Sequence, residues 1–214
     1  GSTEVAKAFA ESVAKDPIPG IQLIVVPVLN TWGYDRRSRG EQGGGSIHDP
    51  NRDYPGPCGG AGPFTLKSTA ALARLVDSEG IVASATLHTF SPAVVYPWGF
   101  STHDTSTPYD DLFKMLTQAA VLESGYETGN SAEAIYPADG TFEDYAFWKH
   151  GILSLLFELG TRHSPTDSDV AEMQKTNTPG MRRFFQQSSL TRAEKHEFTG
   201  KCDRTLRALD RHDE

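Results

Sequence analysis

Two polar side chains each close a stretch of chain with the composition of a buried strand. Glu158 follows the apolar run 152–157 and precedes Gly160, while His88 ends the strand-like run 81–88. A desolvated carboxylate costs several kcal/mol unless a cation meets it, and proteins keep such groups where a raised pKa serves chemistry. Because open α/β sheets place their sites at the carboxyl ends of strands, both side chains are expected to face one crevice. The competing interpretation is that Glu158 emerges into solvent and that His88 is structural.

Four short motifs follow in an order that is more specific than any one of them. They are Val-Pro-Val-Leu-Asn-Thr-Trp-Gly-Tyr at 26–34 with arginines at 36, 37 and 39, Asp-Pro-Asn-Arg at 49–52, His-Thr-Phe-Ser at 88–91 before Tyr-Pro-Trp-Gly at 96–99, and Tyr-Pro-Ala-Asp-Gly at 136–140 before Phe-Glu-Leu at 157–159. In this order they resemble the zinc metallocarboxypeptidases of the carboxypeptidase A/B type, peptidase family M14. The resemblance covers residues 4–160.

The resemblance implies one Zn²⁺ ion and a water-activating carboxylate. His88 matches a zinc-binding histidine, Glu4 matches the zinc-binding glutamate that opens the first helix, and Glu158 matches the general acid/base. Three protein ligands and one open position let zinc polarise a carbonyl and lower the pKa of its water to about 7. Glu158 would take the proton of that water and deliver it to the leaving amine.

The chain departs from the family at the zinc site. Gly1 stands where the family has a histidine three positions before Glu4, and the upstream strands of the family's sheet are absent. Zinc held by Glu4 and His88 alone would bind weakly, because catalytic sites normally use three protein ligands. His48 and His103 are conceivable substitutes that no spacing requires. Either the chain is cut at this point or the natural protein lacks a complete zinc site.

Other matched positions imply a peptide substrate with a free C-terminal carboxylate. Arg52 and Asn51 match the pair that clamps this carboxylate, and a guanidinium fork suits it bidentately. Arg39 matches the arginine that stabilises the oxyanion. A shift of two positions in the register would place Arg37 there instead. Tyr136 matches the mobile tyrosine that closes over substrate.

Two acidic positions complete the set. Asp49 matches the aspartate that orients the missing zinc-binding histidine without binding the metal itself. Glu143 matches the base of the side-chain pocket, where a carboxylate would favour a C-terminal lysine or arginine. Alternatively, Glu143 turns outward or pairs with Lys149 or Arg162.

These residues need a scaffold of alternating helices and strands. The sequence predicts an α/β fold with a mixed, largely parallel central sheet flanked by helices, as one domain over 1–214 with a polar, helical part at 161–214. Helices are expected at 4–15, 65–78 and 109–124, strands at 21–29 and 81–88, and a short helix leading into the last strand at 146–159. Residues 40–62 are expected to form a long loop, and a charged helix is expected to start at Met181 after a turn at 177–180.

Composition limits the partners. The 214 residues carry a net charge of −8, which argues against nucleic acid as the main partner. No apolar stretch approaches the ~20 residues of a membrane helix, so no membrane partner is expected. Cys58 and Cys202 could pair or stay free. The oligomeric state is left open, and the resemblance favours a secreted or periplasmic location over a cytoplasmic one.

Three alternative functions stay open beside the zinc-dependent exopeptidase. One is a peptidase of bacterial cell-wall peptides, which needs only a different pocket. Another is an aspartoacylase-type amidohydrolase, although the segment 136–158 argues against it. The third is a non-catalytic binding module that keeps the carboxylate clamp without the metal.

Overall fold

A four-stranded mixed sheet forms the centre of the protein. The structure is a computed structural model that describes residues 1–59, 64–103 and 105–202. The sheet contains β3 (Ala83–His88), β4 (Ala93–Tyr96), β5 (Glu127–Asn130) and β6 (Leu153–Glu158), in the order β3-β6-β4-β5. β3 runs parallel to β6 and β4 parallel to β5, whereas β4 and β6 are antiparallel. The α/β class with a mixed sheet is as predicted from the sequence.

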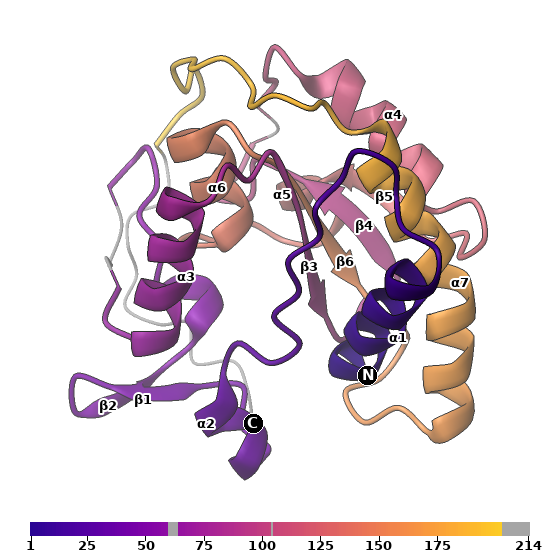
Figure 1. The fold of residues 1–214 in the computed structure, drawn as a ribbon. Coiled ribbons are helices and arrows are strands. Elements are labelled where there is room, and N and C mark those ends of the chain that lie inside the picture. The colour runs from indigo at the N-terminus through magenta and orange to yellow at the C-terminus, as the bar shows by residue number, and fades with distance from the viewer. Residues whose placement is uncertain (60–63, 104, 203–214) are drawn as a thin grey trace.

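Helices cover both faces of the sheet (Figure 1). On one side lie α1 (Ser2–Lys15), α4 (Asp110–Ala120) and α7 (Asp167–Gln187), and on the other lie α3 (Lys67–Ser78) and α6 (Phe142–His150). The short helices α2 (Thr31–Arg36), η1 (Pro50–Arg52) and α5 (Ser131–Ala134) and the hairpin of β1 (Glu41–Gly43) and β2 (Ser46–His48) complete the described elements.

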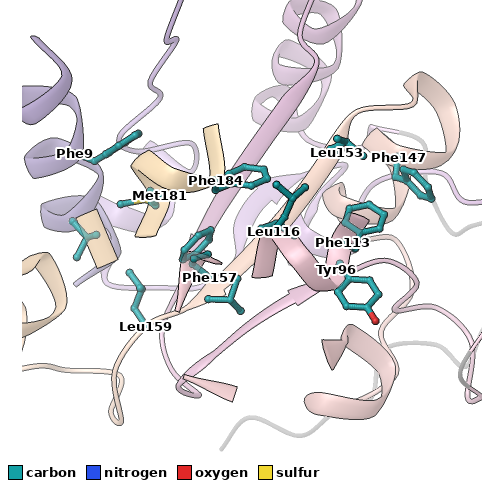
Figure 2. Close-up of a cluster of buried hydrophobic side chains, with 14 of the residues drawn as sticks. Phe9, Tyr96, Phe113, Leu116, Phe147, Leu153, Phe157, Leu159, Met181 and Phe184 are labelled. Atoms are coloured by element: carbon teal, nitrogen blue, oxygen red, sulfur yellow. The ribbon is translucent and has the colours of Figure 1, made fainter. Parts of the chain in front are cut away.

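The main core lies between the sheet and the helices α1, α4 and α7. Figure 2 shows its side chains, among them Phe9, Phe113, Phe157 and Phe184, all of them buried. In α4 the buried residues Phe113, Leu116 and Ala120 recur at the three- and four-residue spacing of one helix face. A smaller cluster packs α3 and α6 around Tyr54. The loop that carries Tyr54 is thereby fixed beside the sheet.

The helices predicted at 4–15, 65–78 and 109–124, the short helix leading into the last strand and the strand at 81–88 are confirmed with shifts of a few residues at their ends. The helix expected to start at Met181 begins at Asp167 instead. The strand predicted at 21–29 is wrong, because none of these residues is in a strand. Ile21 and Leu23 pack against the main core, while Ile24 and Val26 are 39% and 47% exposed, so the run lies extended over the surface of the core. Among the described residues β3 pairs only with β6, so β3 forms one edge of the sheet.

The turn predicted at 177–180 is also wrong. Helix α7 passes through Pro179 and Gly180 without a break. Gly180 lies against the backbone of Ala120 in α4, so close that a Cβ atom would overlap the Ala120 carbonyl oxygen. The stabilisation from packing α7 against α4 therefore exceeds the cost of the backbone hydrogen bond that Pro179 cannot donate.

The cysteines form a disulfide that fastens the C-terminal segment. Cys58 and Cys202 are bonded, with their Cα atoms 5.5 Å apart. The preceding residues 189–202, here called the strap, cross the molecule in extended form, and the Ala193 N–H donates to the Gly151 carbonyl oxygen. The 40–62 segment contains β1, β2 and η1 where a loop was expected. No helix in the described part of the chain is long and apolar enough to cross a membrane.

Candidate functional site

His88 and Glu158 are neighbours at the carboxyl ends of two parallel strands. The register of β3 and β6 sets His88 opposite Glu158, and His88 Nδ1 lies 3.8 Å from Glu158 Oε1. The Leu159 N–H donates to the His88 carbonyl oxygen, which holds the two strand ends together. Glu158 Oε2 is buried and accepts no hydrogen bond from a described residue. Such an oxygen is suited to a ligand or a water molecule.

A small pocket, open to solvent, has this pair on its wall. Six of the eight predicted site residues line it: Arg39, Asn51, Arg52, His88, Tyr136 and Glu158. The rest of the lining is Ser131, Ile135, Ala138, Thr141 and Leu156, and of these Ala138 lies in the Tyr-Pro-Ala-Asp-Gly motif at 136–140. These residues come from α5 and its C-terminal end, from β6 and from the loop before α6.

Burial governs the charge of the pair. Burial raises the pKa of Glu158 to about 7; Arg39 and Arg52 lower it, while Glu143 raises it further. Burial lowers the pKa of His88, although the charge of Glu143 raises it. The arrangement therefore favours a neutral imidazole beside a carboxyl group that exchanges its proton near neutral pH.

Asp49 connects the two arginine-bearing segments of the pocket. Its Oδ2 accepts from Arg39 Nε at 2.7 Å, and its Oδ1 accepts from the Asn51 N–H at 2.9 Å as the cap of η1. Arg52, the last residue of η1, donates from Nη2 to Tyr136 Oη at 3.2 Å. Arg36 stacks over the ring of Trp32 and does not line the pocket.

Glu143 is buried behind the pocket wall and is not among the lining residues. Its carboxylate accepts from Thr86 Oγ1 and, at 3.4 Å, from Asn51 Nδ2. Asn51 Oδ1 accepts from the Phe142 N–H at 2.8 Å, so the Asn51 side chain ties η1 to the start of α6.

Neither proposed protein cation meets Glu143. Arg162 pairs with Asp169 instead, and Lys149 lies over the Trp148 ring. The described residues leave this carboxylate with hydrogen bonds from neutral donors and no ion pair. Thr86 was not singled out from the sequence, although it precedes His88 by two residues and a strand's side chains share a face with period two.

The residues present do not complete a zinc site. Within residues 1–59, 64–103 and 105–202 no group of three or more His, Cys, Asp or Glu side chains is arranged to hold a metal ion. Glu4 pairs with the N-terminal amine at 2.5 Å. A Cβ atom on Gly1 would lie 3.0 Å from Thr89 Cγ2, so residue 1 lies beside the residue that follows His88. Residue 1 therefore lies near the carboxyl end of β3, whereas Glu4 is not among the residues that line the pocket.

The two candidate substitutes lie elsewhere. His48 Nε2 contacts Ser46 Oγ at 2.8 Å, His103 Nδ1 contacts Thr102 Oγ1 at 3.1 Å, and neither residue lines the pocket.

Comparisons with known proteins identify the family of the chain. The family model described as zinc carboxypeptidase matches residues 14–180. Carboxypeptidase B from Astacus astacus is 28% identical over 185 residues, which are 70% of this chain and 61% of that protein. Carboxypeptidase B from Homo sapiens is 28% identical over 170 residues, 65% of this chain and 41% of that protein. The chain thus spans less than two thirds of the length of these relatives.

The fold has close counterparts among solved structures. Bovine thrombin-activatable fibrinolysis inhibitor, solved in complex with tick carboxypeptidase inhibitor, superimposes with a TM-score of 0.73 at 18% identity. The superposition covers 86% of this chain and 77% of that one.

Proposed function

Because this chain belongs to the zinc carboxypeptidase family, we propose that it carries the substrate-binding and proton-transfer residues of an exopeptidase that releases the C-terminal amino acid of peptides. One observation carries the proposal: the parallel register puts Glu158 beside His88 at strand ends, on the wall of a pocket that two arginines share. A carboxyl group with a pKa near 7 and nearby guanidinium groups is a suitable set for peptide hydrolysis.

The two arginines would bind different groups of the substrate. Arg52 would hold the terminal carboxylate of the substrate, since its guanidinium lies in the pocket next to the Tyr136 hydroxyl. Tyr136 is 52% exposed and would fold over the bound chain end. Arg39 offers its two terminal nitrogens, because the Asp49 carboxylate occupies Nε. These N–H groups would stabilise the negative oxygen that develops on the attacked carbonyl.

Glu158 would move the proton. In its ionised form it takes a proton from the attacking water, and in its protonated form it gives that proton to the nitrogen of the leaving amino acid. When bound, zinc would supply a Lewis acid for the carbonyl group. The proposed binding of the substrate's chain end by Arg52 and Tyr136 does not involve the metal.

Replacing Glu158 by glutamine tests the proposal. Glu158→Gln keeps the shape of the side chain and removes proton transfer, so turnover of a peptide substrate by the full-length protein should fall about 10²- to 10⁴-fold. Glu133→Gln is the matched control, because Glu133 is an exposed carboxylate on α5 outside the pocket. Near-normal turnover by Glu158→Gln would sink the assignment.

The proposed specificity rests on Glu143. Among the described residues its buried carboxylate meets only neutral donors, so a substrate lysine or arginine long enough to reach past the pocket wall would supply a cation. Leaving such a carboxylate unpaired against an apolar side chain costs about 2–5 kcal/mol. Peptides that end in arginine should therefore be hydrolysed or bound better than peptides that end in phenylalanine or glutamate.

Three peptides that differ only in the last residue measure this preference. Glu143→Ala should reduce the advantage of arginine, whereas Glu133→Ala should leave it unchanged. A preference for phenylalanine that survives Glu143→Ala would show that Glu143 does not set the pocket.

A location outside the cytoplasm belongs to the same proposal. The Cys58–Cys202 disulfide supports an oxidising compartment, because disulfides persist in secreted and periplasmic proteins and are rare in the cytosol.

A further inference from the structure

The carboxylate of Asp49 contacts two substrate-binding parts of the pocket, here called its arms. One arm is Arg39, and the other is the pair Asn51 and Arg52. Asp49 Oδ2 accepts from Arg39 Nε, and Asp49 Oδ1 accepts from the backbone N–H of Asn51. The first contact fixes a side chain, whereas the second begins the helical turn η1 that presents Arg52. Both oxygens of Asp49 are therefore engaged, one by each arm.

The contact with Arg39 decides how that side chain is used. The Arg39 side chain is 44% exposed, so its long stem is free to move unless an anchor holds it. Asp49 binds the Nε end of the guanidinium, which leaves Nη1 and Nη2 without a hydrogen-bond partner among the described residues. Since the guanidinium is planar, fixing Nε also fixes the direction of the two terminal nitrogens.

The contact with Asn51 decides where the clamp lies. η1 has three residues, and its cap on Asp49 sets the path of the chain into Arg52. The Asn51 side chain is held from the other side by the Phe142 N–H. Loss of the cap would therefore release one end of a short segment that carries the carboxylate-binding residues.

We propose that Asp49 is a positioning residue that sets the oxyanion arm, Arg39, and the carboxylate clamp, Asn51 and Arg52, at a fixed separation along the substrate. In this role Asp49 holds the guanidinium of Arg39 through Oδ2. The inference rests on the proposed exopeptidase function. It predicts that the two arms can be uncoupled by choosing the side chain at position 49.

Two substitutions separate the two contacts. Asp49→Asn keeps an oxygen that can accept from the Asn51 N–H but brings an amide and no charge to Arg39. Asp49→Ala removes both contacts. Asp35→Asn is the control, since Asp35 is an exposed carboxylate on α2 for which the structure shows no bond to the pocket. All variants are made in the full-length protein and are first compared by thermal denaturation.

Asp49→Asn should lower kcat by up to about 100-fold, as expected for a displaced catalytic group, with KM nearly unchanged. Asp49→Ala should lower kcat and also raise KM. Calorimetry with N-acetyl-arginine, which presents a free carboxylate and needs no turnover, should give wild-type affinity for Asp49→Asn and weaker affinity for Asp49→Ala. The double variant Asp49→Asn/Arg39→Gln should turn over no more slowly than Arg39→Gln alone.

Several outcomes would overturn the proposal. Wild-type kcat for Asp49→Asn beside an impaired Arg39→Gln would show that Asp49 does not position Arg39. Equal loss of N-acetyl-arginine affinity in Asp49→Asn and Asp49→Ala would show that the two contacts are not separate. Normal turnover by both Arg39→Gln and Glu158→Gln would instead overturn the exopeptidase function on which the proposal rests.

Discussion

Burial and two arginines shift the pKa of the Glu158 carboxyl group in opposite directions. Burial and the charge of Glu143 favour its protonated form, while Arg39 and Arg52 favour the ionised form. The balance leaves its pKa at about 7, well above the ordinary value of 4.5. A general base is active only when ionised, so the sign of the pH dependence follows directly.

We expect kcat/KM to rise with pH through a midpoint near 7 and to level off above it. In Glu143→Gln the midpoint should move to lower pH, because one negative charge that disfavours ionised Glu158 is removed. A pH–rate profile of the full-length protein measures both values, with Glu133→Gln as the variant that should not shift. A midpoint near 4.5 in the unaltered protein would contradict the effect of burial.

Single residues were predictable where strand geometry fixes them. The pairing of His88 with Glu158 follows from two strands that end at the same edge of a sheet, and the sequence shows both ends. The partner of Asp49 was not predictable, because Arg39 reaches it across a hairpin that lacks a clear strand pattern. The burial of Glu143 against Thr86 joins residues 57 positions apart, which no local pattern encodes.

At the scale of elements, the packing of α4 against α7 allows a sharp test. Gly180→Ala would push a methyl group into the Ala120 carbonyl oxygen, which is backbone and cannot swing aside. We expect a loss of about 1–3 kcal/mol in the free energy of unfolding, since overpacking outweighs the better helix propensity of alanine. Denaturant unfolding measures the difference.

Gly80→Ala provides the comparison, because a Cβ atom at that position meets nothing within 4 Å. It should change stability little. Equal stability of the two variants would mean that α4 and α7 are less closely packed than described.

Elements with one clear apolar face were predictable, and those decided by long-range packing were not. Helix α1 was predictable because Val5 and Phe9 recur at helical spacing. Composition alone indicated a strand at 21–29, but a strand needs a partner edge, and these residues have none in the described structure. The pair Pro179-Gly180 is typical of a turn, and the sequence does not show the contact with Ala120 that keeps these residues in a helix.

At the scale of the whole molecule, the disulfide joins segments that the sequence left unconnected. Cys58 and Cys202 are 144 residues apart, and the strap between α7 and Cys202 crosses from one side of the sheet to the other. Along its path Arg192 donates to the carbonyl oxygen of Ile81, and the Glu194 N–H donates to Tyr109 Oη. The pairing could not be deduced from two cysteines at an uninformative spacing.

Removing the disulfide should lower the free energy of unfolding by about 2–5 kcal/mol, because a long closed loop restricts the unfolded chain. The double variant Cys58→Ser/Cys202→Ser and the reduced wild-type protein should unfold at similar denaturant concentrations, both below the oxidised protein. Reductant should have no effect on the double variant. An oxidised protein no more stable than the reduced one would contradict the contribution of this bond.

Strand β3 leaves one border of the described sheet without a partner strand. β3 is half-buried along its length, and within the described residues its outer side pairs with no strand. Unpaired backbone N–H and C=O groups along such a border are a template for another extended chain, and native proteins commonly guard them with lysine or proline. The sequence Ala-Ser-Ala-Thr-Leu-His of β3 contains neither. An extended segment that pairs with the described sheet at this border would therefore find nothing in the sequence of β3 that opposes it.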